Sequence, residues 1–270
     1  MFGWISRSDL PEDATVDWLF AVFGWLLEET GGYQAFRARA KLVLPTDEFF
    51  PISANLEGHD LALSLFTAAR EHAGLAGRAC KLIPHEEGPT TRDLLGDVPY
   101  GESSKEGAAG AFHGAAASEG LISYAPSGLR DPEAFVATMA HELGHYIIHS
   151  FSEPAPGGEE AREPATDVCA IFLGFGVFTA NAAFRFEQHQ TAYTQGWSYR
   201  RLGYLGERPL SYGLAIFLAL LGLEVRAVVG KLRDNPYGYV KTALKHLAKE
   251  GSGELARLRA ISGRRLGAAL

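Results

Sequence analysis

The strongest chemical signal in the chain is the pentapeptide His141-Glu142-Leu143-Gly144-His145. It stands in a stretch that favours a helix, where residues four apart lie one above the other on the same face. Both imidazoles can therefore reach one metal ion, with the carboxylate of Glu142 beside it. A hydrolytic zinc site usually takes three protein ligands and keeps a fourth position for water. The pattern predicts a zinc hydrolase whose third ligand lies elsewhere in the chain.

That third ligand is sought downstream of the pentapeptide. The metzincin extension would require glycine at position 148 and histidine at position 151, where the chain has Ile148 and Phe151. Further on, Glu163 and Asp167 are four apart, and Pro164 is tolerated only in the first turn of a helix. A helix that begins shortly before this proline places both carboxylates on one face. One of the two can bind the metal, and the other can hold a ligand imidazole in its correct tautomer.

The helix that carries the pentapeptide has a clear beginning. Asp131 is a natural N-cap, Pro132 suits the first helical position and Glu133 favours the positive end of the helix dipole. We therefore expect a helix over residues 132–149. Its apolar face and its histidines form separate stripes, which places the histidines beside a cleft rather than within the core.

The remaining pattern predicts an α+β protein. Helices are expected at residues 16–29 and 61–73, and short strands at 41–44, 79–83, 111–113 and 121–124, with a polar loop over 86–110. After residue 157 the pattern is helical, at 165–178, 184–193, 212–223 and 239–247. We expect a small mixed sheet in an N-terminal part, residues 1–150, that ends in the motif helix. A helical part, residues 151–270, carries the third ligand, and both parts form one continuous catalytic domain.

Composition narrows the class of protein. The chain has 270 residues, of which 47% are hydrophobic, enough for a sizeable core, and its net charge of −7 argues against general nucleic-acid binding. Basic residues near the C-terminus are interpreted as a solvated helical face, with nucleic-acid or partner binding as the alternative. Cys80 and Cys169 form no paired motif, and no secretory signal is readable, so a cytoplasmic protein is expected. The apolar runs at 168–184 and 214–223 are short for a membrane span and predict buried helices.

The two carboxylates and the pentapeptide together carry a family resemblance. His141-Glu142-x-x-His145 followed by Glu163-x-x-x-Asp167 resembles the gluzincin metallopeptidases, the thermolysin-like group in which a second helix supplies a glutamate ligand and an aspartate that supports a histidine. The stretches 137–145, 163–167 and 172–181 also resemble uncharacterised bacterial proteins predicted to be zincins. A weaker likeness, over 141–149 alone, is to small intracellular zincins that cleave repressors of mobile elements.

This resemblance implies a minimal zincin-like fold, Zn²⁺ as cofactor and a peptide or protein substrate. By implication His141, His145 and Glu163 hold the zinc ion, and Glu142 moves a proton from water to the leaving amine. An extended substrate is expected to pair with the strand at 121–124 or with the one at 111–113. An oxyanion donor should also exist. The candidates are His189, Tyr193, Tyr199, Tyr204 and Tyr212.

The alternative function is a metal-binding regulatory or interaction protein of zincin fold without proteolytic activity. The presence of Glu142 favours the enzyme, because a purely structural zinc site needs no carboxylate at that position.

Overall fold

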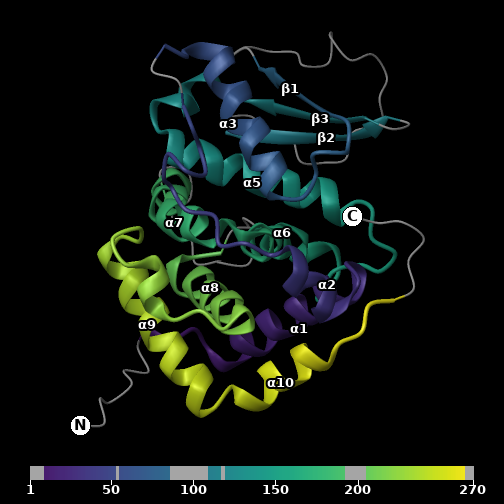
Figure 1. The fold of residues 1–270 in the computed structure, drawn as a ribbon, viewed down its shortest axis with the longest axis vertical. Helices are drawn as coiled ribbons and strands as arrows, with labels where there is room; N and C mark the ends of the chain where they lie inside the picture. Colours follow the sequence, from purple (N-terminus) through teal and green to yellow (C-terminus); the bar gives the residue numbers. More distant parts are fainter. Residues whose placement is uncertain (1–8, 53–54, 86–108, 117–118, 192–204, 265–270) are drawn as a thin grey trace.

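The computed structural model describes residues 9–52, 55–85, 109–116, 119–191 and 205–264, and its side chains except those of 114–116, 119 and 184–191. The protein is mixed α+β, with a small sheet at one end and helices through the rest (Figure 1). The sheet has three strands in the order β1-β3-β2, and β3 is parallel to β1 and antiparallel to β2. Their bounds are Cys80–Pro84 for β1, Gly110–Ala116 for β2 and Glu119–Tyr124 for β3. The predicted α+β class with a small mixed sheet is confirmed.

The motif helix α5 (Pro132–Ile148) lies between the sheet and most of the other helices, whereas α3 (Gly58–His72) lies beside the sheet (Figure 1). Its beginning follows the prediction, because the Asp131 side chain accepts a hydrogen bond of 3.1 Å from the backbone N–H of Ala134. One face of α5 packs on the sheet, where the rings of Tyr146 and Phe112 are 5.6 Å apart. The opposite side contacts α6. The helix therefore joins the sheet to the helical part of the molecule.

The stretch after residue 161 was predicted as a single helix from 165 to 178, and the structure divides it. It forms α6 (Arg162–Ala170), a π-helical turn η4 (Ile171–Phe175) and α7 (Gly176–Thr191). The break falls at Gly174, which has a φ of 104° and approaches the backbone of Lys41 so closely that a Cβ would collide with its carbonyl oxygen. Only glycine is tolerated in this position.

The same contact corrects the prediction of a strand at residues 41–44. These residues are irregular, and the backbone N–H of Val43 donates to the carbonyl oxygen of Gly174 at 3.0 Å. The segment thus forms a backbone hydrogen bond with the π-helical turn instead of with a strand of the sheet.

Other helices complete the bundle, and the N-terminal helix α1 packs against α6, α8 and α10. Both ends of the chain therefore contribute to one continuous core. The predicted helices are present with bounds that differ by a few residues, and α2 was missed because its glycine-rich beginning was interpreted as a helix end. The bounds are α1 Asp13–Glu29, α2 Gly32–Arg39, α3 Gly58–His72, α8 Glu207–Leu221, α9 Asp234–Lys249 and α10 Ser252–Ala260, with short 3-10 turns at η2 Pro126–Arg130, η3 Glu159–Ala161 and η5 Val225–Val228.

One helical stretch in the described part of the chain, Glu159–Ala183, is long and apolar enough to cross a membrane. Its most apolar window is 94% buried inside the protein, as expected for the core helix of a soluble protein.

Candidate metal centre

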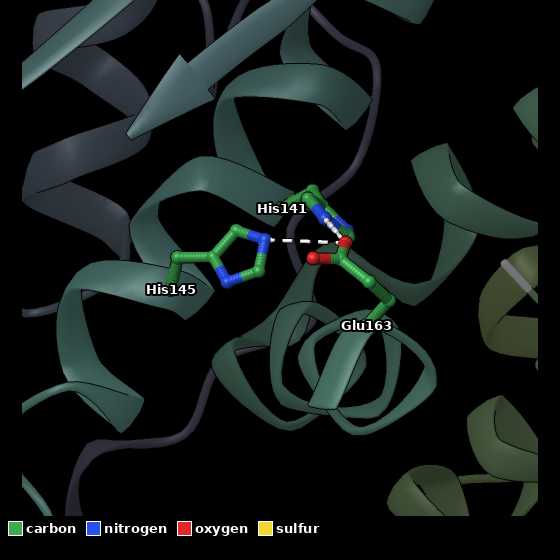
Figure 2. A group of neighbouring side chains, drawn as sticks. All are labelled: His141, His145 and Glu163. Atoms are coloured by element: carbon green, nitrogen blue, oxygen red, sulfur yellow. Dashed lines mark hydrogen bonds and ion pairs between the residues drawn. The ribbon is translucent and has the colours of Figure 1, made fainter. Parts of the chain in front are cut away.

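Two helices bring three predicted ligands together. His141 and His145 project from α5, and Glu163 projects from the first turn of α6 toward both imidazoles (Figure 2). The Oε2 atom of Glu163 lies 3.3 Å from Nε2 of His141 and 3.4 Å from Nε2 of His145. One ligand atom from each of the three residues lies within 4.8 Å of the other two. The spacing predicted from the sequence is therefore realised as a cluster that could hold a metal ion.

The separations suit a small divalent ion. Donor atoms bound at about 2.0–2.1 Å in a tetrahedral arrangement are roughly 3.4 Å apart. The two nitrogen–oxygen separations involving Glu163 match this value. Two imidazoles and one carboxylate are the donor set of hydrolytic zinc sites, although the same set also accepts other first-row divalent ions. The residues present thus fit the group that the sequence implies.

Asp167 contacts the imidazole nitrogen of His141 that does not face Glu163, as predicted. Its Oδ1 atom is 2.8 Å from Nδ1 of His141, and its Oδ2 atom accepts a 2.8 Å hydrogen bond from the backbone N–H of Leu205. Burial by itself disfavours the imidazolium, but hydrogen bonds with Asp167 and Glu163 outweigh it and raise the pKa of His141 to about 10. A metal ion at Nε2 takes the place of a proton there, so ion binding is coupled to proton release.

Glu163 is the most exposed ligand, with 31% of its side chain accessible, whereas the side chains of His141 and His145 are 8% and 5% accessible. Solvent therefore reaches the cluster on the side of Glu163. Partial burial acts to raise the pKa of Glu163, but hydrogen bonds with the two histidines outweigh it and hold the pKa well below the usual range. The carboxylate is ionised, as a metal ligand must be.

Glu142 lies beside the cluster without belonging to it. It is 5% exposed, and its carboxylate accepts a hydrogen bond from the backbone of Phe112 in β2. Its Oε2 atom is buried without a hydrogen-bond partner in the described part of the chain. Burial raises the pKa of Glu142, against the opposing effect of the two histidines. A buried carboxylate oxygen with no partner is costly unless a ligand or water meets it, which is a second sign of a binding site here.

Thr166 makes a contact with His145 that the sequence did not suggest. This fully buried residue places its Oγ1 atom 3.2 Å from Nδ1 of His145. Its position beside Asp167 in the same helix was the available signal, but a threonine has no distinctive spacing in metal sites.

Among the predicted oxyanion donors, Tyr212 does not belong to the cluster. It is fully buried, and its hydroxyl is 2.8 Å from Nδ1 of His246 in α9. Because its hydroxyl contacts His246, Tyr212 is excluded as the oxyanion donor. The other four candidates, His189, Tyr193, Tyr199 and Tyr204, lie outside the residues whose side chains are described.

Comparisons with protein-family models, with curated proteins and with solved structures gave no match. The class of protein is therefore defined by fold and site alone. This is a mixed α+β protein in which two buried histidines and a partly exposed glutamate could hold a metal ion.

Proposed function

We propose that this protein is a zinc-dependent metallopeptidase of zincin-like fold, similar in its site to the gluzincins, that acts in the cytoplasm on a peptide or protein. The observation that carries the proposal is the convergence of His141, His145 and Glu163 next to the unpartnered carboxylate oxygen of Glu142. A site that only stabilises a fold has no use for such a carboxylate. The cytoplasmic assignment is supported by Cys80 and Cys169, which are both free thiols.

The chemistry follows from the roles that these side chains can take. His141, His145 and Glu163 would hold a divalent ion, which would supply a Lewis acid and lower the pKa of water to about 7. Glu142 then acts as the general base that accepts the proton of the attacking water and returns it to the leaving amine. Its raised pKa suits this role, because a base must also be able to release the proton it has taken.

The arrangement of the sheet is evidence for a substrate that binds in an extended conformation. Among the described strands β3 is central and β2 is an edge strand, so of the two candidate substrate strands only β2 can take a further partner on its outer side. The backbone N–H of Ala125 donates to the carbonyl of Ala109, and in an antiparallel ladder the bonded pairs alternate. Gly110 and Phe112 therefore direct their backbone groups away from β3, toward the outer edge where Glu142 lies.

The test is metal analysis combined with digestion of a peptide library by the wild-type protein and by Glu142→Gln. We expect both proteins to bind about one zinc ion, since Glu142 is not a ligand. We expect the variant to lose roughly 10²–10⁴-fold in cleavage rate, which is the usual contribution of a general base.

A matched control is Glu159→Gln, which removes an exposed carboxylate near the beginning of α6 and should leave cleavage unchanged. Zinc binding without cleavage by the wild-type protein would reject the peptidase and favour a metal-binding regulatory protein. Equal cleavage by wild type and Glu142→Gln would reject the proposed base.

A further inference from the structure

Thr166 makes two hydrogen bonds. Its Oγ1 atom is 2.9 Å from the carbonyl oxygen of Arg162, one turn earlier in α6, and 3.2 Å from Nδ1 of His145 in α5. The residue is fully buried, and His145 is 4% exposed. Water therefore does not compete for these contacts.

A metal ion at Nε2 of His145 decides where the hydrogen atoms lie. Nε2 faces Glu163 and would give its lone pair to the ion, so the hydrogen of the neutral imidazole stands on Nδ1. Nδ1–H then donates to Oγ1 of Thr166. The single hydrogen of the hydroxyl goes to the carbonyl oxygen of Arg162, which can only accept.

The contact depends on close packing of the two helices. Gly144, one residue before His145, faces Thr166, and a Cβ at Gly144 would lie 3.0 Å from Cγ2 and 3.1 Å from the carbonyl oxygen of Thr166. Both distances are tighter than ordinary van der Waals contacts. The absence of a side chain at this position lets α6 come near enough for the hydroxyl to reach the imidazole.

We propose that Thr166 is a positioning residue that holds His145 as its Nδ1–H tautomer, so that Nε2 is presented to the metal ion. The two imidazoles then have unlike supports, an ionised carboxylate for His141 and a neutral hydroxyl for His145. The inference rests on the metal site of the proposed function and not on peptide cleavage.

The first measurement needs no substitution. Nitrogen-15 NMR of the zinc-loaded wild-type protein should show a hydrogen on Nδ1 of His145 that exchanges slowly with solvent, because it is buried in the hydrogen bond to Thr166. Zinc bound at Nδ1, or no hydrogen detectable there, would overturn the proposal.

The second measurement compares Thr166→Val, which removes the hydroxyl at nearly constant shape, with Thr166→Ser, which keeps it. Competition with a chromophoric chelator should show zinc affinity about 10–100-fold weaker for the valine variant, the usual cost of losing a group that orients a metal ligand. The serine variant should stay close to wild type, and only the valine variant should show faster solvent exchange of the Nδ1 hydrogen in its zinc-loaded form. Wild-type affinity and exchange rate in a folded valine variant would contradict the proposal.

Two outcomes separate this inference from the proposed function. Normal zinc binding with the expected effects of the two variants, but without peptide cleavage, rejects the peptidase and supports the role of Thr166. Peptide cleavage with no difference in zinc affinity or in exchange of the Nδ1 hydrogen between Thr166→Val and Thr166→Ser supports the peptidase and rejects the role of Thr166. If the valine variant does not fold, the NMR result for the wild-type protein alone decides.

Discussion

At the scale of single residues, Asp167 has to satisfy two donors at once. One carboxylate oxygen accepts from His141 and the other from the backbone of Leu205, at 2.8 Å each. The aspartate therefore ties an imidazole ligand to the segment that leads into α8. An amide of the same shape cannot replace it, because an amide offers only one acceptor oxygen.

We predict that Asp167→Asn weakens zinc binding by about 10–100-fold. Whichever way the amide is turned, its NH₂ group faces an N–H of either His141 or Leu205, and the imidazole loses its ionised partner. The measurement is chelator competition on the purified variant, with Glu159→Gln as the control that removes a carboxylate outside the cluster. Unchanged affinity in Asp167→Asn would show that the ligand keeps its orientation without the carboxylate.

At the scale of elements, the approach of β2 to α5 places the proposed substrate strand beside Glu142, the proposed general base. A Cβ at Gly110 would lie 2.8 Å from Cγ2 of Thr138 and 3.2 Å from Cγ of Glu142. The strand can therefore come this close to the helix only because position 110 carries no side chain. The contact involves the base and none of the three metal ligands.

We predict that Gly110→Ala reduces peptide cleavage by at least about tenfold while zinc affinity stays at the wild-type value, because a shift of about 1 Å at a catalytic group has effects of this size or larger. Peptide kinetics and chelator competition measure the two quantities separately. Adding Thr138→Ser removes the closest contact and should restore part of the rate. Gly77→Ala is the control, since a Cβ there meets no atom within 4 Å. Parallel losses of zinc and activity in Gly110→Ala would mean that the whole site is disturbed.

A feature could be predicted from the sequence where the residues that determine it are neighbours in the chain. The beginning of α5 was predictable because Asp131 and Pro132 stand at the helix start itself, and the ligand Glu163 because a proline limits where α6 can begin. The π-turn at Gly174 was not predictable, since it depends on contact with Lys41, far away in the chain. The same holds for Thr166 and Gly110, whose roles arise only when two elements meet.

At the scale of the whole molecule, the C-terminal segment is tied to the loop that joins the two metal-binding helices. Glu29 at the end of α1 is fully buried, and its carboxylate accepts from the backbone N–H of Ser152 at 3.1 Å and from Arg264 at 3.1 Å. Arg264 also contacts Glu28 at 3.0 Å and Glu153 at 3.3 Å. Arg264, one of the basic C-terminal residues interpreted as a solvated helical face, is 43% exposed but lies after the end of α10 and contacts several acidic groups.

This arrangement predicts that Arg264→Ala lowers the melting temperature clearly more than Arg257→Ala, whose guanidinium forms an exposed pair with Glu254. Removing Arg264 leaves the buried carboxylate of Glu29 without its cation, which costs more than losing a solvated pair. The double variant Arg264→Ala with Glu29→Gln should recover part of the loss, since no unpaired charge then remains buried. The measurement is thermal unfolding followed by circular dichroism. It compares wild type with Arg264→Ala, Arg257→Ala, Glu29→Gln and the double variant. Equal losses for Arg264→Ala and Arg257→Ala, or a double variant less stable than both single ones, would mean that the C-terminal segment does not depend on this ion pair.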